Sequence, residues 1–198
     1  MTDESKTNSQ LLEEVAQLHQ QIKRLEKSEA RCLQSEKNLR DQTFIDELTD
    51  LYNRRGFLVM GQQQIKIGSR TKKPVLLLFG DLDDLKNIND NYGHPAGDQA
   101  LRDVAYILRG TFRESDVISR LGGDEFAVVA LVNENGSPDI ILKRIDERTR
   151  QHNLKQGRPY NLSLSVGIAE CNPEQSCSIS ELLRQADEAM YRKKTKHD

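Results

Sequence analysis

The sequence predicts an α+β domain, in which helices cover a β-sheet, preceded by one long helix. Residues 74–79 are a continuous apolar run, which is typical of a buried central strand. The apolar stretches 116–121 and 126–132 enclose a Gly-Gly turn and predict a β-hairpin. Residues 162–168 alternate between apolar and polar side chains, as a strand with one buried face does.

Residues 11–43 show the heptad spacing of a coiled-coil helix that pairs with a second copy of the chain. The residues at the two seam positions are Leu11, Leu18, Leu25, Cys32 and Leu39 at one, and Val15 and Ile22 at the other. Glu29 and Glu36 then occupy the second position, so like charges would weaken the C-terminal half of the pair. The alternative is a single solvated helix. We expect residues 1–10 to be disordered.

Capping residues predict the helices of the domain. Asp98 is expected to cap a helix, after a shorter helix that breaks off at residues 93–97. Ser137 and Pro138 open another helix, and residues 178–181 form a capping box for the last one. The expected order is helix, strand, two helices, hairpin, helix, strand, helix.

The composition excludes several classes of partner. The chain has 29 Lys and Arg against 31 Asp and Glu, so it has no basic field to attract nucleic acid or an anionic membrane. The longest apolar run, 126–132, is far shorter than the roughly 20 residues that span a bilayer, and residues 1–10 are too polar for a signal peptide. Cys32, Cys171 and Cys177 are odd in number and lack CxxC spacing. We therefore expect neither a disulfide framework nor a zinc site, and a cytoplasmic location.

Two pairs of acidic residues indicate a metal site. Asp81 and Asp83 end the apolar strand, and Asp124 and Glu125 lie at the tip of the hairpin. If the hairpin lies beside that strand, Asp81 and Asp124 can share Mg²⁺ or Mn²⁺, with Lys86 nearby as a phosphate donor. The alternative is that these acids only cap turns and that the glycines only provide positive φ.

Residues 122–126 read Gly-Gly-Asp-Glu-Phe and resemble the signature of the GGDEF diguanylate cyclases, bacterial enzymes that join two GTP molecules into cyclic di-GMP. Further similar motifs follow in the family's order and register at residues 46–55, 81–101, 165–169 and 186–191. The resemblance implies a central, mostly antiparallel β-sheet surrounded by helices, similar to nucleotidyl cyclases and polymerase palms, with residues 44–198 as the catalytic domain.

The resemblance also implies the metal site. Asp81, Asp124 and the Leu82 carbonyl are the implied ligands, and Glu125 is a second acidic contributor. The site would hold two Mg²⁺ or Mn²⁺ ions in each active half-site. The base for the GTP 3′-hydroxyl would be Asp124 or a water molecule on the metal.

Other positions match residues that hold the nucleotide in the family. Lys86 and Lys194 match phosphate-binding lysines. Asn89 and Asp98 match positions that read the guanine edge, where a carboxylate accepts from the N1–H and N2–H₂ donors. Gly123 would allow the nucleotide to approach the backbone closely.

An RxxD motif, Arg113 to Asp116, lies where the family has its product-inhibition site. By resemblance these two residues bind cyclic di-GMP, with Arg144 as a second arm. Asp46 and Arg54 are expected to form a structural ion pair.

The sequence departs from the family pattern after Lys194. The family continues with Gly-Arg-Asn, whereas this chain continues with Thr-Lys-His-Asp. One phosphate-binding arginine is missing there, and Lys196 is its expected partial substitute.

The resemblance thus implies a homodimeric diguanylate cyclase, with GTP as substrate and cyclic di-GMP as product and inhibitor. One alternative is a non-catalytic receptor for cyclic di-GMP, which only the missing Gly-Arg-Asn segment supports. The other is a coiled-coil adaptor, which would leave the nucleotide-binding residues unexplained.

Overall fold

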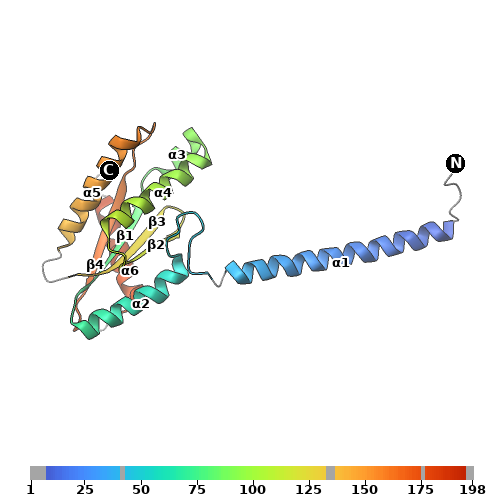
Figure 1. Cartoon of the computed structure of the whole chain (residues 1–198), viewed down its shortest axis with the longest axis horizontal. Helices are drawn as coiled ribbons and strands as arrows, with labels where there is room; N and C mark the ends of the chain where they lie inside the picture. Colours follow the sequence, from blue (N-terminus) through green and yellow to red (C-terminus); the bar gives the residue numbers. More distant parts are fainter. Residues whose placement is uncertain (1–7, 41–42, 133–136, 175–176, 195–198) are drawn as a thin grey trace. The chain divides into compact units, whose positions relative to one another are not determined.

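The computed structural model describes residues 8–40, 43–132, 137–174 and 177–194 (Figure 1). The chain divides into two compact units, Met1–Thr43 and Phe44–Asp198. The described elements are α1 (Asn8–Arg40), α2 (Arg54–Thr71), β1 (Val75–Leu82), α3 (Leu85–Tyr92), α4 (His94–Thr111), β2 (Val117–Gly122), β3 (Glu125–Leu131), α5 (Pro138–Gln156), β4 (Leu164–Cys171) and α6 (Ile179–Lys194).

The first unit contains helix α1, as the heptad spacing predicts. Its apolar side chains at Val15, Leu18, Ile22 and Leu25 are 48%, 51%, 51% and 69% exposed. The seam side chains of Leu11, Cys32, Glu36 and Leu39 lie outside the described residues. Most of the segment expected to be disordered, 1–7, also lies outside them, whereas Asn8 already begins α1. None of the described helices is long and apolar enough to cross a membrane.

The second unit is built on a four-stranded sheet with the order β2-β3-β1-β4 in the part of the chain that the structure describes. Every neighbouring pair of strands is antiparallel. Strand β1 is central and is buried on both faces, which explains its continuous apolar run. The α+β architecture predicted from the sequence is confirmed.

Helices cover both faces of this sheet and enclose two cores (Figure 1). Leu76, Leu78 and Leu82 of β1 face α3, α4 and α5. The alternate residues Val75 and Leu77 face α2 and α6. The period-2 alternation of a strand thus distributes one apolar run between two helical layers.

Helix α2 was not predicted as a separate element. Its glycines lower its helix propensity, yet Asn53 caps it by accepting a hydrogen bond from Gly56 N at 2.9 Å. Gly61 and Gly68 lie on its buried face, where a Cβ would crowd Ile179 and Val75. Close packing against α6 and the sheet therefore explains glycines that look unfavourable in the sequence.

The prediction that Asp98 caps α4 is wrong. The helix begins at His94, after Gly93 with φ 83°, and Pro95 lies in its first turn. Asp98 is therefore inside the helix, with an exposed side chain.

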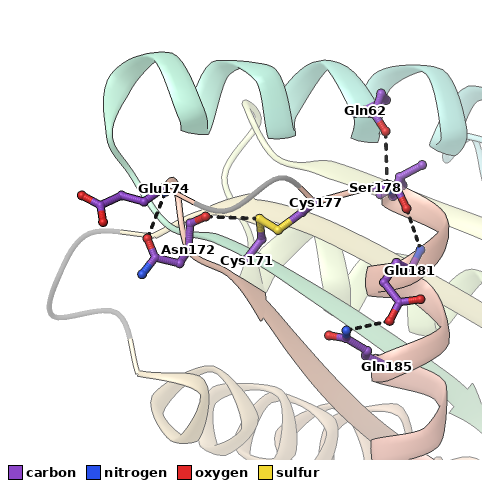
Figure 2. The surroundings of a disulfide bond; sticks show 9 residues. Gln62, Cys171, Asn172, Glu174, Cys177, Ser178, Glu181 and Gln185 are labelled. Atoms are coloured by element: carbon purple, nitrogen blue, oxygen red, sulfur yellow. Dashed lines mark hydrogen bonds between the residues drawn. A yellow bond between two sulfur atoms is a disulfide. The ribbon is translucent and has the colours of Figure 1, made fainter.

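The prediction of no disulfide is also wrong, because Cys171 and Cys177 are bonded (Figure 2). Cys171 ends β4 and Cys177 precedes α6, and the short connection between them brings their Cα atoms to 6.3 Å. Ser178 Oγ then caps α6 by accepting from Glu181 N at 3.1 Å. In a complete capping box the Glu181 carboxylate would accept from Ser178 N. Here it accepts from Arg184 and Gln185.

Candidate active site

The sheet register places the hairpin tip beside the end of β1. Asp81 lies opposite Glu125 in the β1–β3 pair, and Leu82 N donates to Asp124 O at 3.0 Å. Strands β1 and β3 are distant in sequence, so only their pairing brings the two acidic segments together. Burial raises the pKa of Asp81, the charges of Asp124 and Asp83 raise it further, and Lys194 opposes the rise.

Lys194 lies at the end of α6 and provides the positive charge in this group. Its Nζ is 2.6 Å from Asp81 Oδ1 and 3.4 Å from Asp83 Oδ1. The hydrogen bond to Asp81 raises the pKa of Lys194. An ammonium group between two carboxylates shows that this position suits a cation.

The oxygen groups fit a divalent ion whose remaining coordination positions are filled by the substrate. In the described part of the chain no three His, Cys, Asp or Glu side chains converge closely enough to hold a metal by themselves. Mg²⁺ commonly takes one or two carboxylates and fills its remaining positions with water and phosphate oxygens. Asp81 and Asp124, with the Leu82 carbonyl, match that pattern.

Asp83 has a different environment from Asp81. Its carboxylate accepts from Ser163 Oγ at 2.8 Å and from Ser165 Oγ at 2.7 Å. The sequence grouped Asp83 with Asp81 as a metal-site pair. The structure shows that Asp83 fastens the end of β1 to β4 and to the segment before it.

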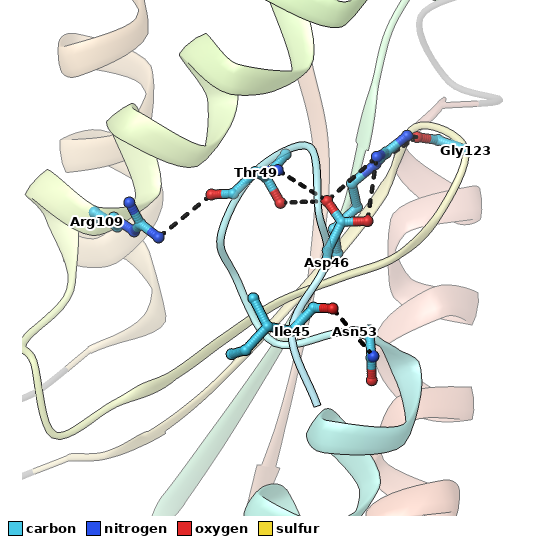
Figure 3. Close-up of polar contacts among 7 residues, drawn as sticks. Ile45, Asp46, Thr49, Asn53, Arg109 and Gly123 are labelled. Atoms are coloured by element: carbon cyan, nitrogen blue, oxygen red, sulfur yellow. Dashed lines mark hydrogen bonds and ion pairs between the residues drawn. The ribbon is translucent and has the colours of Figure 1, made fainter. Parts of the chain in front are cut away.

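The turn of the hairpin is held by Arg120, which the sequence analysis did not select. Arg120 Nε and Nη2 donate to Gly123 O at 3.0 and 2.8 Å. Its Nη1 is 3.3 Å from Asp46 Oδ1, which also accepts from Thr49 N and Oγ1 (Figure 3). The expected partner of Asp46 was Arg54, so that pairing is corrected. The available signal was a charged residue within a mostly apolar strand.

Both turn glycines adopt positive φ, 151° at Gly122 and 54° at Gly123. A Cβ at either position would meet no atom within 4 Å. The φ of Gly122 suits glycine almost alone, whereas Asp50 and Lys72 adopt nearly the same φ as Gly123, so conformation requires Gly122 more strongly than Gly123. The closer approach of a nucleotide to Gly123 stays a prediction.

The predicted base-reading residues lie on both sides of the turn between α3 and α4. Asn89 is partly buried on α3, and Asp98 is exposed on α4. A Cβ at Gly97 would overlap the Asn89 side chain, so this glycine allows Asn89 to pack against α4. Lys86 is exposed at the start of α3, directly after β1.

The RxxD motif forms a tight turn between α4 and β2. Arg113 N donates to Asp116 Oδ2 at 2.9 Å, and Asp116 N donates to Arg113 O at 3.0 Å. Burial raises the pKa of Asp116, and the hydrogen bond and charge of Arg113, with the charge of Arg144, oppose the rise. Arg144 donates to Thr111 O at the end of α4. The structure thus brings Arg113, Asp116 and Arg144 together.

A cavity of about 430 Å³ opens at this turn, and Asp81, Asp124 and Glu125 do not line it. Its lining residues are Ile45, Asp50, Leu51, Tyr52, Arg109, Arg113, Glu114, Asp116 and Ile118. Arg109 also donates to the backbone oxygens of Thr49 and Asp50, so it fixes the loop that forms one wall (Figure 3).

Residues 43–198 match the model of the family described as diguanylate cyclase, GGDEF domain. The chain belongs to the GGDEF family. Diguanylate cyclase TpbB of Pseudomonas aeruginosa (strain UCBPP-PA14) is 37% identical to it over 172 residues, covering 84% of this chain and 39% of the relative. This GGDEF chain thus spans about two fifths of the length of that curated relative.

Solved structures agree with the GGDEF fold. A microbial GGDEF domain studied with cyclic di-GMP has a TM-score of 0.66 and 33% identity, over 77% of this chain and 94% of that one. Diguanylate cyclase SiaD of Pseudomonas aeruginosa, solved in complex with its activator SiaC, has a TM-score of 0.68 and 26% identity. That likeness covers 95% of this GGDEF chain and 75% of SiaD. The family predicted from the sequence is confirmed.

Proposed function

We propose that this GGDEF domain is a homodimeric diguanylate cyclase that condenses two GTP molecules into cyclic di-GMP and two pyrophosphates. One observation carries the proposal. The sheet register sets the acidic turn of Asp124 and Glu125 beside Asp81, where Lys194 already balances negative charge. Membership of the family and the likeness to TpbB support the same reaction.

The reaction needs a nucleophile, a charge-stabilising site and a leaving group in line. The 3′-hydroxyl oxygen of one GTP forms a bond to the α-phosphorus of the other, and the bond from that phosphorus to the bridging oxygen of pyrophosphate breaks. Asp124 is the proposed acceptor of the hydroxyl proton. Mg²⁺ held by Asp81 and Asp124 would offset charge on the phosphate oxygens when bound.

Two lysines contribute positive charge from opposite sides of the sheet end. Lys86 follows β1 directly, and Lys194 ends α6. Lys194 Nζ donates a hydrogen bond to Asp81 Oδ1. We propose that it exchanges this contact for a phosphate oxygen when GTP binds, which would free Asp81 for the metal.

Base selection would come from Asn89 and Asp98. A carboxylate at Asp98 accepts from the N1–H and N2–H₂ groups of guanine, and adenine offers no such pair of donors. The exposed position of Asp98 leaves its carboxylate available for this purpose.

Two loaded domains must face each other, because each supplies one half of the site. Helix α1 is the proposed dimerisation element, and its partner is a second copy of this chain. Its half-exposed apolar side chains have the spacing of a coiled-coil seam. Pairing would raise the effective concentration of the second domain.

We further propose that cyclic di-GMP inhibits the enzyme by binding Arg113 and Asp116, with Arg144 as a second arm. The cavity at this turn and the three adjacent charged groups support this proposal. The arginines would pair with phosphates of the ligand.

The test is to incubate the purified chain with GTP and Mg²⁺ and to measure cyclic di-GMP and pyrophosphate. The wild-type chain should form both in a ratio of one to two, and Asp124→Asn should lower the rate by about 100-fold or more because it removes a charged group at the reacting centre. Equal rates in the two proteins would contradict the role of Asp124.

A second candidate is a receptor that binds cyclic di-GMP without making it. One observation favours it: Lys194 is followed by Thr-Lys-His-Asp where the family has Gly-Arg-Asn. A folded dimer that binds cyclic di-GMP but forms no pyrophosphate would establish this reading and overturn the enzyme reading.

A further inference from the structure

The segment 157–163, which joins α5 to β4, makes two reciprocal hydrogen bonds with the turn between α3 and α4. Tyr92 Oη, at the end of α3, donates to Pro159 O at 3.1 Å. Tyr160 Oη donates to Ala96 O, in the first turn of α4, also at 3.1 Å. The two tyrosine rings lie 5.7 Å apart between their centroids. Each side of the turn is therefore held by one hydroxyl group.

The turn needs such support because Gly93, at its centre, has φ 83°. Glycine populates many backbone conformations, so the angle between α3 and α4 is weakly determined by local sequence. Tertiary hydrogen bonds on both sides of Gly93 select one arrangement.

A buried ion pair fixes the position of Tyr160. Asp103 on α4 is only 5% exposed, and Arg158 Nη2 lies 2.8 and 3.0 Å from its two carboxylate oxygens. Arg158 Nη1 also donates to Tyr160 Oη at 3.4 Å. Gln99 donates to Asp103 Oδ1, and His152 Nε2 lies 3.3 Å from Oδ2 without hydrogen-bond geometry. A charge so deeply buried is stable only with such partners.

The far end of the segment is fastened as firmly. Asn153 on α5 exchanges two hydrogen bonds of 2.9 Å with the backbone of Leu162. Ser163 then donates to Asp83 at the end of β1. The segment 157–163 thus connects α5, the acidic end of β1 and the α3–α4 turn.

We propose that Tyr160 and Tyr92 are positioning residues for base recognition, with Asp103 and Arg158 as their anchor. The proposal rests on the proposed function, in which Asn89 and Asp98 read guanine. Asp98 lies two residues after Ala96, and Asn89 packs against Gly97. A displacement of the first turn of α4 would therefore move both base-reading residues, while the acidic site on β1 and the hairpin stays in place.

The test compares two uncleavable ligands, a GTP analogue with a methylene bridge between the α- and β-phosphates and its inosine counterpart, which lacks the 2-amino group. Their dissociation constants are measured by calorimetry with Mg²⁺ for the full chain and for Tyr160→Phe. We expect the variant to bind the guanine ligand about threefold to tenfold more weakly, as loss of one hydrogen bond predicts, and the inosine ligand much less so.

The discrimination between the two ligands should therefore narrow, while kcat with GTP stays within about twofold because the phosphate site is untouched. An unchanged ratio of the two dissociation constants would overturn the proposal. A merely structural role would weaken both ligands equally.

Tyr106→Phe is the matched control, since Tyr106 is on α4, the helix that Tyr160 contacts, is 71% exposed and should leave the ratio unchanged. Tyr92→Phe is the second variant. The Tyr92 side chain is 46% exposed, so loss of its hydroxyl group should leave the fold intact. Thermal unfolding of the variant checks this. Tyr92→Phe should narrow discrimination in the same direction. The proposed function is tested separately: it fails if the wild-type chain releases no pyrophosphate from GTP. The discrimination between the two bases does not depend on that result, because it is measured by binding.

Discussion

Glu125 lies at the hairpin tip among other acidic residues, and its pKa is raised. Burial is the main cause that raises its pKa above the usual 4.5, and the charges of Asp124 and Asp81 raise it further. Arg54 opposes this rise. Ionising Glu125 is therefore less favourable in the folded chain than in the unfolded chain. Its contribution to stability is full below the unfolded pKa and is lost as pH rises through the folded pKa.

The variant Glu125→Gln should therefore gain stability relative to the wild type as pH rises. The two proteins should differ least near pH 4 and most above the folded pKa, because glutamine carries no charge to desolvate. The measurement is urea unfolding with a chelator present, at intervals between about pH 4 and pH 8. Glu170→Gln, at an exposed position on β4, is the control. A variant that became less stable than the wild type with rising pH would contradict the prediction.

Sequence reasoning at this scale found the acidic residues but not the contacts that hold them. Asp81 and Asp124 could be placed together from the sequence, because the apolar pattern of each strand and the turn of the hairpin largely determine how the strands pair. Arg120 reaches Asp46 across 74 positions of the chain, and Asp83 reaches Ser163 across 80. Polar contacts over such separations depend on how the helices and loops pack, which one sequence does not specify.

Strand β4 and helix α6 approach each other closely at Gly167. A Cβ there would overlap the backbone of Ala186 and Met190. These atoms belong to a helix backbone that cannot move without displacing Lys194 at its end. Gly167 thus connects the packing of two elements to the position of a site residue.

Gly167→Ala should lower the free energy of unfolding by about 3 kcal/mol, as overpacking against backbone does. Gly80→Ala is the matched control on the neighbouring strand, where a Cβ would lie 3.6 Å from Leu78 and 3.7 Å from Ser165 and Val166. It should change stability by less than about 1 kcal/mol. Urea unfolding of both variants checks this, and equal losses would contradict the close-packing account.

The disulfide between Cys171 and Cys177 closes a short loop next to the cap of α6. Reduction should lower the free energy of unfolding by about 2 kcal/mol, because a small closed loop removes limited entropy from the unfolded chain. The measurement is unfolding with and without reductant. Cys177→Ser should have the stability of the reduced wild-type chain both with and without reductant. A wild-type chain whose stability does not change with reductant would contradict the prediction.

Elements with strong patterns were predictable, and those determined by packing were not. The run 74–79 predicted β1, and Ser137 predicted the start of α5, whose cap accepts from Asp139 N. Helix α2 was not predicted, because its glycines are explained by close contact with α6 and the sheet. The start of α4 escaped because Gly93 and Pro95 begin the helix before the capping residue that the sequence suggested.

Taken as a whole molecule, the chain combines a folded domain with a helix that has no core of its own. Val15, Leu18 and Ile22 are about half exposed in the isolated chain. Most of the stability of a helix in a protein comes from packing of its apolar face, and an apolar seam of this spacing favours packing against a second helix. The heptad spacing predicted the helix itself, whereas its pairing depends on a second chain.

Removing residues 1–43 should therefore separate folding from turnover. The domain 44–198 is a compact unit of its own and should keep its unfolding midpoint. Its activity per chain should fall by about tenfold or more at micromolar concentration and recover as the concentration rises, because two domains must then meet by diffusion. Sedimentation and initial rates over a range of concentrations measure both quantities. In the full chain, Glu29→Leu with Glu36→Leu should tighten the dimer and change the activity. A truncated domain that stays monomeric yet keeps full activity at every concentration would exclude α1 as the element that brings the half-sites together.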